Sequence, residues 1–152
     1  MITIGWREWV ALPQLGVSTI KAKIDTGART SSLHTGRIET FREHGAARAR
    51  FTVHPFQETT EVELVCETDV VDYRRITNSG GHSEERYVVR TLIRVGSEEW
   101  PIELSLTNRE SMTFRMLLGR TALRGHLLID AGRSYLTGVR HHHAYERVQD
   151  GR

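Results

Sequence analysis

The sequence predicts a mostly β fold with one short helix, and three observations support this prediction. No segment of any length repeats its apolar residues with the period of a helix. Short segments that alternate apolar and polar residues recur along the chain instead. Glycine-containing turn signals separate several of them. Many short strands with hairpin signals are typical of a barrel or a sandwich, so we expect a single compact β domain of the barrel kind.

The expected strands follow from these alternations and from clusters of β-branched residues. In segment 19–24, for example, Ile20, Ala22 and Ile24 share one face and the two lysines share the other. Turns are expected at 43–45, at 78–81 and near 96–99, where Gly or Asn tolerates a positive φ. The segments expected to form the sheet are 2–9, 19–24, 37–41, 47–53, 61–71, 73–77, 86–95, 100–106, 116–118 and 127–130, and 134–136 is expected to finish the fold.

The helix is expected from Arg120 to about Arg124, directly after Gly119. At 152 residues the chain is long enough for one domain with a real core, which we place at residues 1–138. Residues 139–152 are expected to form a basic, flexible tail. The three adjacent histidines in that tail, 141–143, are not interpreted as a metal site, because neighbours on a flexible segment rarely converge on one ion.

Composition excludes several classes of function. The longest apolar runs are only a few residues, and charged residues stand where a signal peptide needs its apolar stretch, so we expect a cytoplasmic protein without membrane contact. One cysteine, Cys66, excludes an internal disulfide and a cysteine-based zinc site, and its apolar surroundings predict a buried thiol. The three tryptophans are interpreted as core or interface residues rather than as a nucleic-acid platform.

The residues that point to chemistry begin at Asp25, at the end of an apolar strand and before Thr26, Gly27 and Ala28. Gly27 lets the backbone turn sharply and approach a substrate closely. The hydroxyl of Thr26 can brace the loop, and the small side chain of Ala28 leaves space beside it. A carboxylate held in this way can have its pKa tuned for acid–base work.

A second element, the apolar segment 116–118 followed by Gly119 and Arg120, lies more than ninety residues later. Together the two elements resemble the retropepsin family of aspartic peptidases. The run from Ile24 to His34 is similar, more closely, to a bacterial family labelled "ATP-dependent zinc protease". That family is RimB-like and includes proteins encoded beside a RimK-type glutamate ligase. The chain has no Gly-rich phosphate loop and no His-Glu-x-x-His helix, so no metal and no cofactor are expected.

The resemblance implies an aspartic endopeptidase in which Asp25, Thr26 and Gly27 form the catalytic motif and Ala28, Gly119 and Arg120 support it. Two neighbouring carboxylates share one proton, and each chain carries one Asp-Thr-Gly motif, so the resemblance implies a homodimer acting on a peptide or protein substrate. Asp130, Ala131 and Gly132 superficially repeat the motif. We interpret them as a structural turn, since Ala131 lacks the bracing hydroxyl.

The resemblance also assigns a glycine-tipped flap to the segment between the two elements. Asn78, Ser79, Gly80 and Gly81 occupy that position, as a flap or as an ordinary surface hairpin. Viral retropepsins place an aspartate after the motif, where it pairs with the arginine of the second element. This chain has Arg29 there, which predicts like charges facing Arg120 and a different dimer.

A second hypothesis keeps the fold without proteolysis. In it, the chain is a regulatory or peptide-binding domain whose partner is a RimK-type ligase or an acidic, glutamylated peptide. Arg29 and the basic tail fit an acidic partner.

Overall fold

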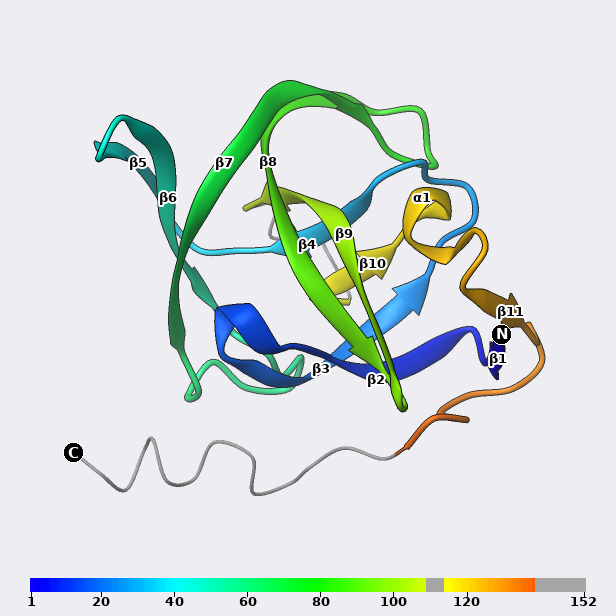
Figure 1. Cartoon of the computed structure of the whole chain (residues 1–152). Helices are drawn as coiled ribbons and strands as arrows, with labels where there is room; N and C mark the ends of the chain where they lie inside the picture. Colours follow the sequence, from blue (N-terminus) through cyan, green and yellow to red (C-terminus); the bar gives the residue numbers. More distant parts are fainter. Residues whose placement is uncertain (109–113, 139–152) are drawn as a thin grey trace.

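The computed structural model describes residues 1–108 and 114–138 (Figure 1). Within these residues the chain is built from strands, one 3-10 turn and one short α-helix. The elements in chain order are β1 (Ile2–Ile4), β2 (Arg7–Leu12), η1 (Pro13–Leu15), β3 (Val17–Ile24), β4 (Ser31–His34), β5 (Ile38–Glu43), β6 (Ala46–Val53), β7 (Leu64–Thr77), β8 (Ser83–Val95), β9 (Glu98–Thr107), β10 (Met116–Leu118), α1 (Arg120–Leu123) and β11 (Leu127–Ile129). The mostly β class and the single short helix after Gly119 are confirmed.

The main sheet has nine strands in the order β2-β3-β10-β4-β9-β8-β7-β6-β5. It curls until β2 meets β8 at one position, where Ala11 pairs with Arg94. The predicted barrel is therefore better described as a curled sheet. One residue pair closes the ring, and the sheet continues past β8 into the β7, β6 and β5 strands.

The concave side of the curled sheet encloses the apolar core. Alternation along β3 buries Ile20, Ala22 and Ile24 as predicted, while Lys21 and Lys23 lie on the other face. The indole of Trp100 on β9 donates to the carbonyl of Ala122 at 3.0 Å and so ties α1 to the sheet. The largest side chains that are almost completely buried are Phe51, Ile4, Leu12, Ile20, Leu33, Ile93, Leu104, Leu106, Met116 and Leu118.

The first predicted strand is two strands in the structure. At Gly5 an added Cβ would collide with the carbonyl oxygen of Arg133, so the backbone there passes too close to a neighbouring segment for a side chain. Before this point β1 leaves the main sheet and pairs in parallel with β11, Ile2 opposite Leu127 (Figure 1). After it β2 pairs antiparallel with β3. Alternation could not show this switch, because it continues on both sides of Gly5.

Three other expectations differ from the structure. Segments 61–71 and 73–77 are one strand, β7, with an irregularity between Val70 and Asp72. Strand β4 was not predicted, and its burial on every residue explains why it shows no alternation. Segment 134–136 is not a strand, because Tyr135 has a φ of 55°.

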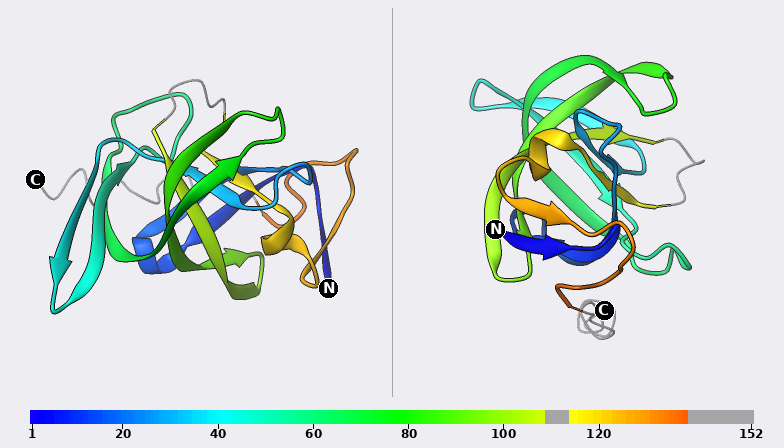
Figure 2. Two further views of the ribbon diagram at one scale, coloured as in Figure 1. Left: turned by 90° about the horizontal axis from the view of Figure 1, so that it is seen from above. Right: turned by 90° about the vertical axis from the view of Figure 1, so that its right-hand side faces the viewer.

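The β5–β6 hairpin projects from the body as an arm (Figure 2). Its turn is the predicted one at 43–45, where His44 and Gly45 have φ values of 51° and 81°. Within residues 1–108 and 114–138, no helix is long and apolar enough to cross a membrane. The expected basic tail and its three histidines lie outside the described residues.

Candidate active site

Asp25 follows the last residue of β3 and is held in a tight turn. Its backbone N–H donates to the carbonyl of Leu118 at 2.8 Å, which continues the pairing between β3 and β10. Its Oδ1 accepts a bond from the backbone N–H of Gly27 at 3.1 Å. The N–H of Ala28 donates back to the Asp25 carbonyl at 3.2 Å. The carboxylate is thus oriented by its own turn.

Gly119 and Arg120 pack against this turn. A Cβ on Gly119 would stand 2.8 Å from the carbonyl carbon of Thr30 and 2.9 Å from the carbonyl oxygen of Ala28, so only glycine fits there. The N–H of Arg120 donates to the same Ala28 oxygen at 2.8 Å. The two elements that are distant in sequence form one unit.

The side chain of Arg120 reaches the motif itself. Its Nη1 donates to the carbonyl oxygen of Thr26 at 2.9 Å. The carbonyl of Arg29 is anchored separately by the N–H and the hydroxyl of Thr121, at 3.1 and 2.9 Å. Arg120 therefore supports the turn through a backbone oxygen and needs no acid at position 29. This explains how the chain keeps the motif with an arginine in that place.

The tip of the β7–β8 hairpin lies over Asp25. Ser79 donates from its hydroxyl to Oδ2 of Asp25 at 3.2 Å. A Cβ on Gly27 would come within 2.9 Å of the Cβ of Ser79, so Gly27 lets the tip approach this closely. The side-chain oxygen of Asn78 shapes the tip by accepting from the N–H groups of Gly80 and His82. The predicted hairpin thus covers the candidate catalytic residue in a single chain.

Between the turn and the hairpin is a cavity of about 250 Å³. Its wall combines the motif, the hairpin tip and the start of β4, and Asp25 is the one carboxylate among the residues known to line it. The described lining residues are Lys23, Asp25, Ala28, Thr30, Ser32, Ile76, Thr77, Asn78, Ser79, Gly80, Arg86, Phe114 and Leu117. A peptide bond placed here would lie next to Asp25.

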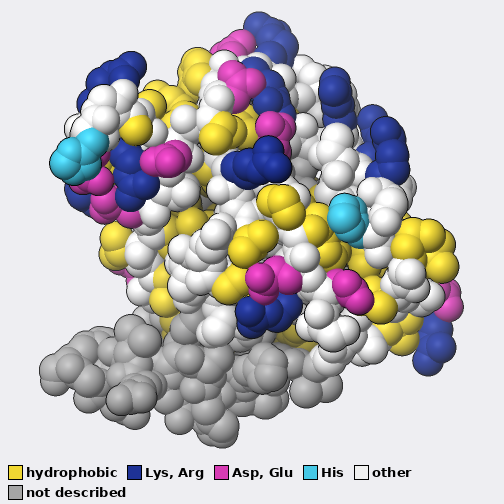
Figure 3. Space-filling model, viewed as in Figure 1, with side chains coloured by type: hydrophobic (Ala, Val, Ile, Leu, Met, Phe, Trp, Pro, Cys, Tyr) yellow, Lys and Arg dark blue, Asp and Glu magenta, His cyan; other side chains and the backbone are white. Residues whose placement is uncertain are grey.

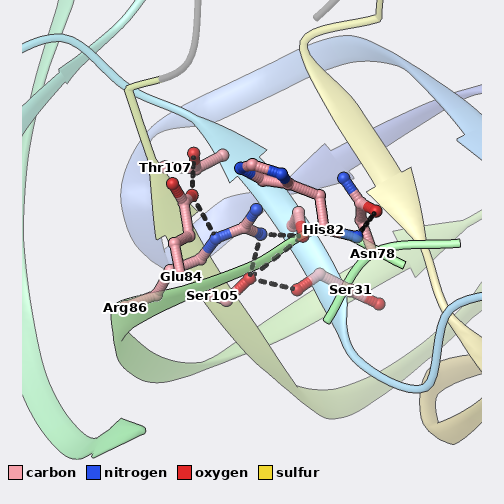
Figure 4. A network of polar contacts seen from close by, with 8 residues as sticks. Ser31, Asn78, His82, Glu84, Arg86, Ser105 and Thr107 are labelled. Atoms are coloured by element: carbon pink, nitrogen blue, oxygen red, sulfur yellow. Dashed lines mark hydrogen bonds and ion pairs between the residues drawn. The ribbon is translucent and has the colours of Figure 1, made fainter. Parts of the chain in front are cut away.

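A polar network at one wall of this cavity was not predicted (Figure 4). Its centre is Arg86 on β8, which is only 5% exposed. Its Nε donates to Glu84 at 2.6 Å, and its Nη1 contacts the hydroxyls of Ser32 and Ser105 at 3.0 and 3.3 Å. The sequence contained one signal for its burial. Arg86 is two residues before the buried Val88 on the same strand, so the two side chains point to the same face of the sheet. Which distant side chains meet it could not be read from that pattern.

Asp130 has the same local turn as Asp25 but a different place in the fold. Its Oδ1 accepts from the N–H of Gly132 at 3.1 Å. Its own N–H donates to the carbonyl of Ile4, at the end of the small β1–β11 sheet. Asp130 does not line the cavity that holds Asp25. This location fits the interpretation of a structural turn.

These features are those of one family. Residues 3–140 match the family described as the retropepsin-like aspartic endopeptidase RimB. The chain belongs to this family. A crystal structure of a Legionella pneumophila protein of unknown function superimposes with a TM-score of 0.74 at 29% sequence identity, covering 90% of this chain and 97% of that one.

Several curated relatives carry the name probable alpha-L-glutamate ligase. The protein from Shewanella pealeana is 47% identical over 135 residues, which is 89% of this chain and 30% of the relative. The protein from Desulfotalea psychrophila is 46% identical over 127 residues, which is 84% of this chain and 27% of the relative. This chain therefore spans less than a third of the length of these ligases.

Proposed function

We propose that this chain is an aspartic endopeptidase of the retropepsin type. The observation that carries the proposal is the position of Asp25, which is oriented by its Asp-Thr-Gly turn, lines a cavity and is covered by a hairpin that contacts it. Such a covered cavity limits the access of bulk water to a bound substrate and keeps one carboxylate at the reacting bond. Membership of the family described as an endopeptidase supports the same assignment.

The chemistry needs two carboxylates, and we propose that a second copy of the chain supplies the other. Asp25 and Asp25 of the partner subunit would share one proton, since two adjacent carboxylates cannot both ionise. The ionised one takes a proton from water while the water oxygen bonds to the peptide carbonyl carbon, and the protonated one hydrogen-bonds the carbonyl oxygen. The carbon–nitrogen bond then breaks as a proton passes to the nitrogen, which releases an acid and an amine.

The test is cleavage of unstructured peptides by the wild-type chain and by Asp25→Asn. Asparagine keeps the shape of the turn but cannot take or give a proton, so we expect the rate to fall by at least about 100-fold. Asp130→Asn is a matched control, because Asp130 has the same local turn outside the cavity. Equal rates for Asp25→Asn and the wild type would contradict the proposal.

The dimer makes a separate prediction. If each active site needs two chains, activity per chain falls on dilution, and it falls in parallel with the dimer fraction measured by sedimentation. Adding inactive Asp25→Asn chains to the wild type should also lower activity by forming mixed dimers. A monomeric chain with full activity would contradict the shared dyad.

A second candidate function follows from the relatives. Since proteins named alpha-L-glutamate ligase contain a segment similar to this chain, the chain could serve as a peptide-binding domain that works with a RimK-type ligase. This alternative predicts that Asp25→Asn retains binding to the ligase and its effect on ligation. The endopeptidase proposal predicts that the substitution removes the chain's effect together with cleavage.

A further inference from the structure

Strand β5 is an open end of the main sheet. It is the last strand in the strand order, and within the described residues no strand pairs with its outer side. Its pairing with β6 runs from Ile38 to Glu43 without a register shift, and this segment contains no proline, glycine or lysine. Proteins often protect an edge strand with a bulge, a proline or a lysine. The edge of β5 has none of these and is regular enough to accept another strand.

The position of β5 in the fold leaves this edge accessible. Strands β5 and β6 form the arm that projects from the body (Figure 2). Within β5, residues 39, 40, 42 and 43 are exposed. Neither strand contributes a residue to the described lining of the cavity that holds Asp25. A contact made through β5 is therefore separate from the candidate active site.

The charges along this edge are complementary to themselves about Thr40. Arg37 is three residues before Thr40 and Glu43 is three residues after it, so the two side chains share one face of the strand. An antiparallel β5 strand of a second copy, centred on Thr40, places Arg37 opposite the partner subunit's Glu43 at both ends. Centring on Phe41 would oppose Glu39 to the partner subunit's Glu43, and centring on Glu39 would oppose that acid to itself. The charges therefore select the register centred on Thr40.

The ion pairs that these two side chains make within one chain are long and exposed. Nε of Arg37 lies 3.7 Å from Glu39, and the two side chains are 87% and 51% exposed. Glu43 lies 3.8 Å from Nε of Arg48, which makes a shorter contact of 2.9 Å to Asp69. Figure 3 shows basic and acidic side chains next to one another on the arm, at the upper left. Since exposed ion pairs contribute little to stability, Arg37 and Glu43 can exchange these contacts for contacts with a second copy.

We propose that β5 is an interaction surface for a second copy of this chain, whose own β5 pairs with it antiparallel about Thr40. The same surface of each copy is used, so the contact has twofold symmetry and closes on itself. Backbone hydrogen bonds between the two edges hold the strands together, and the pairs of Arg37 with the partner subunit's Glu43 fix their register. The contact goes beyond the proposed function, because it joins two arms and no residue of the cavity.

Charge reversal tests the register, with association measured by sedimentation at several concentrations. Arg37→Glu and Glu43→Arg each place like charges at both ends of the paired strands, so each should weaken association of the arms roughly 10-fold. The double variant restores opposite charges and should associate as the wild type does. Glu98→Arg, at the exposed start of β9, is the matched control for Glu43→Arg and should have no effect. Single variants that associate like the wild type, or a double variant no better than the singles, would overturn the proposal.

A disulfide link tests the centre of the contact. Cys66 is the single cysteine, so Cys66→Ala gives a background without thiols. In that background Thr40→Cys should form a linked dimer with copper phenanthroline, because opposed Cα atoms of antiparallel strands are about 4.5–5.5 Å apart, within disulfide range. Arg42→Cys, on the same face of β5, is the control. Its two copies would lie more than about 10 Å apart and should not link. No link through Thr40→Cys, or an equal link through Arg42→Cys, would overturn the proposal.

The size of the assemblies separates this inference from the proposed function. If the Asp25 dyad also forms, each chain has two different contacts with other copies, and the wild type should form assemblies larger than a dimer. Arg37→Glu should then reduce them to dimers that still cleave peptides. If the dyad does not form, the wild type should stop at a dimer and Arg37→Glu should be a monomer. Both results support the arm contact, whereas equal assembly sizes for the wild type and Arg37→Glu would overturn it and leave the endopeptidase standing.

Discussion

The hydroxyl of Ser79 lies 3.2 Å from Oδ2 of Asp25, across 54 positions of sequence. The bond joins the tip of the β7–β8 hairpin to the turn that carries the motif, within one chain. The Ser79 hydroxyl donates to Oδ2 and the backbone N–H of Gly27 donates to Oδ1, so each oxygen of the carboxylate accepts one hydrogen bond. The bond therefore fastens the tip of the hairpin over the cavity, and we call it the latch.

Removing the latch should loosen the hairpin. In Ser79→Ala the tip loses one hydrogen bond to a charged group, worth roughly 1 kcal/mol where it is exposed, so local opening should rise about five-fold. Hydrogen exchange of the amides at 80–83 measures this opening. Ser97→Ala, in the exposed turn between β8 and β9, is the control and should leave those amides unchanged. Equal exchange in Ser79→Ala and the wild type would show that the bond does not restrain the tip.

Gly119→Ala should destabilise the whole site. The added Cβ would meet the backbone of Thr30 and Ala28 at 2.8 to 2.9 Å, and backbone atoms cannot move away as a flexible side chain can. We expect a loss of about 2–4 kcal/mol in the free energy of unfolding, measured with urea. Gly132→Ala is the control, since its nearest contact is 3.6 Å from a side-chain oxygen. A loss for Gly119→Ala no larger than that of the control would disprove the close packing.

Glu8 is a completely buried carboxylate that sequence reasoning passed over. It accepts bonds from the N–H groups of Gly5, Leu136 and Thr137 and from the Thr137 hydroxyl, at 2.7 to 3.1 Å. Glu8→Gln turns one acceptor into a donor that faces these donors, so we expect a loss of about 2–4 kcal/mol in urea unfolding. Glu98→Gln, on an exposed residue, should change stability by less than about 0.5 kcal/mol. Similar losses for both variants would mean that the network contributes little.

Cys66 predicts how stability depends on pH in the alkaline range. Burial raises the pKa of its thiol from 9.0 to about 11. The folded chain thus holds the proton to a higher pH than the unfolded chain does. The protonated thiol therefore adds to the free energy of unfolding. This stabilisation is fully present below about pH 9 and is lost as pH rises toward 11. Between pH 8 and 10.5, wild-type stability in urea should fall more steeply than that of Cys66→Ala, whose other titrating groups are the same. Parallel curves would contradict the prediction.

Local features were predicted well because neighbouring residues determine them. The turn at Asp25, the turn at 43–45 and the helix after Gly119 depend on backbone dihedral angles and short-range hydrogen bonds, which residue types show directly. The strand at β3 was predicted because one of its faces is buried and the other is exposed, so its pattern alternates. Strand β4, buried on all its residues, leaves no such pattern.

The sequence by itself determined the mostly β class, the motif at Asp25 and the element at Gly119 that supports it, because each of these is written in a short run of residues. Only the tertiary structure decided that Ser79 reaches Asp25, that Glu8 holds Leu136 and Thr137, and that Arg86 meets Ser32 and Ser105 at the wall of the same cavity. Such contacts join residues up to 129 positions apart. They depend on strand order and register in the curled sheet, and many strand orders are compatible with the same alternating pattern.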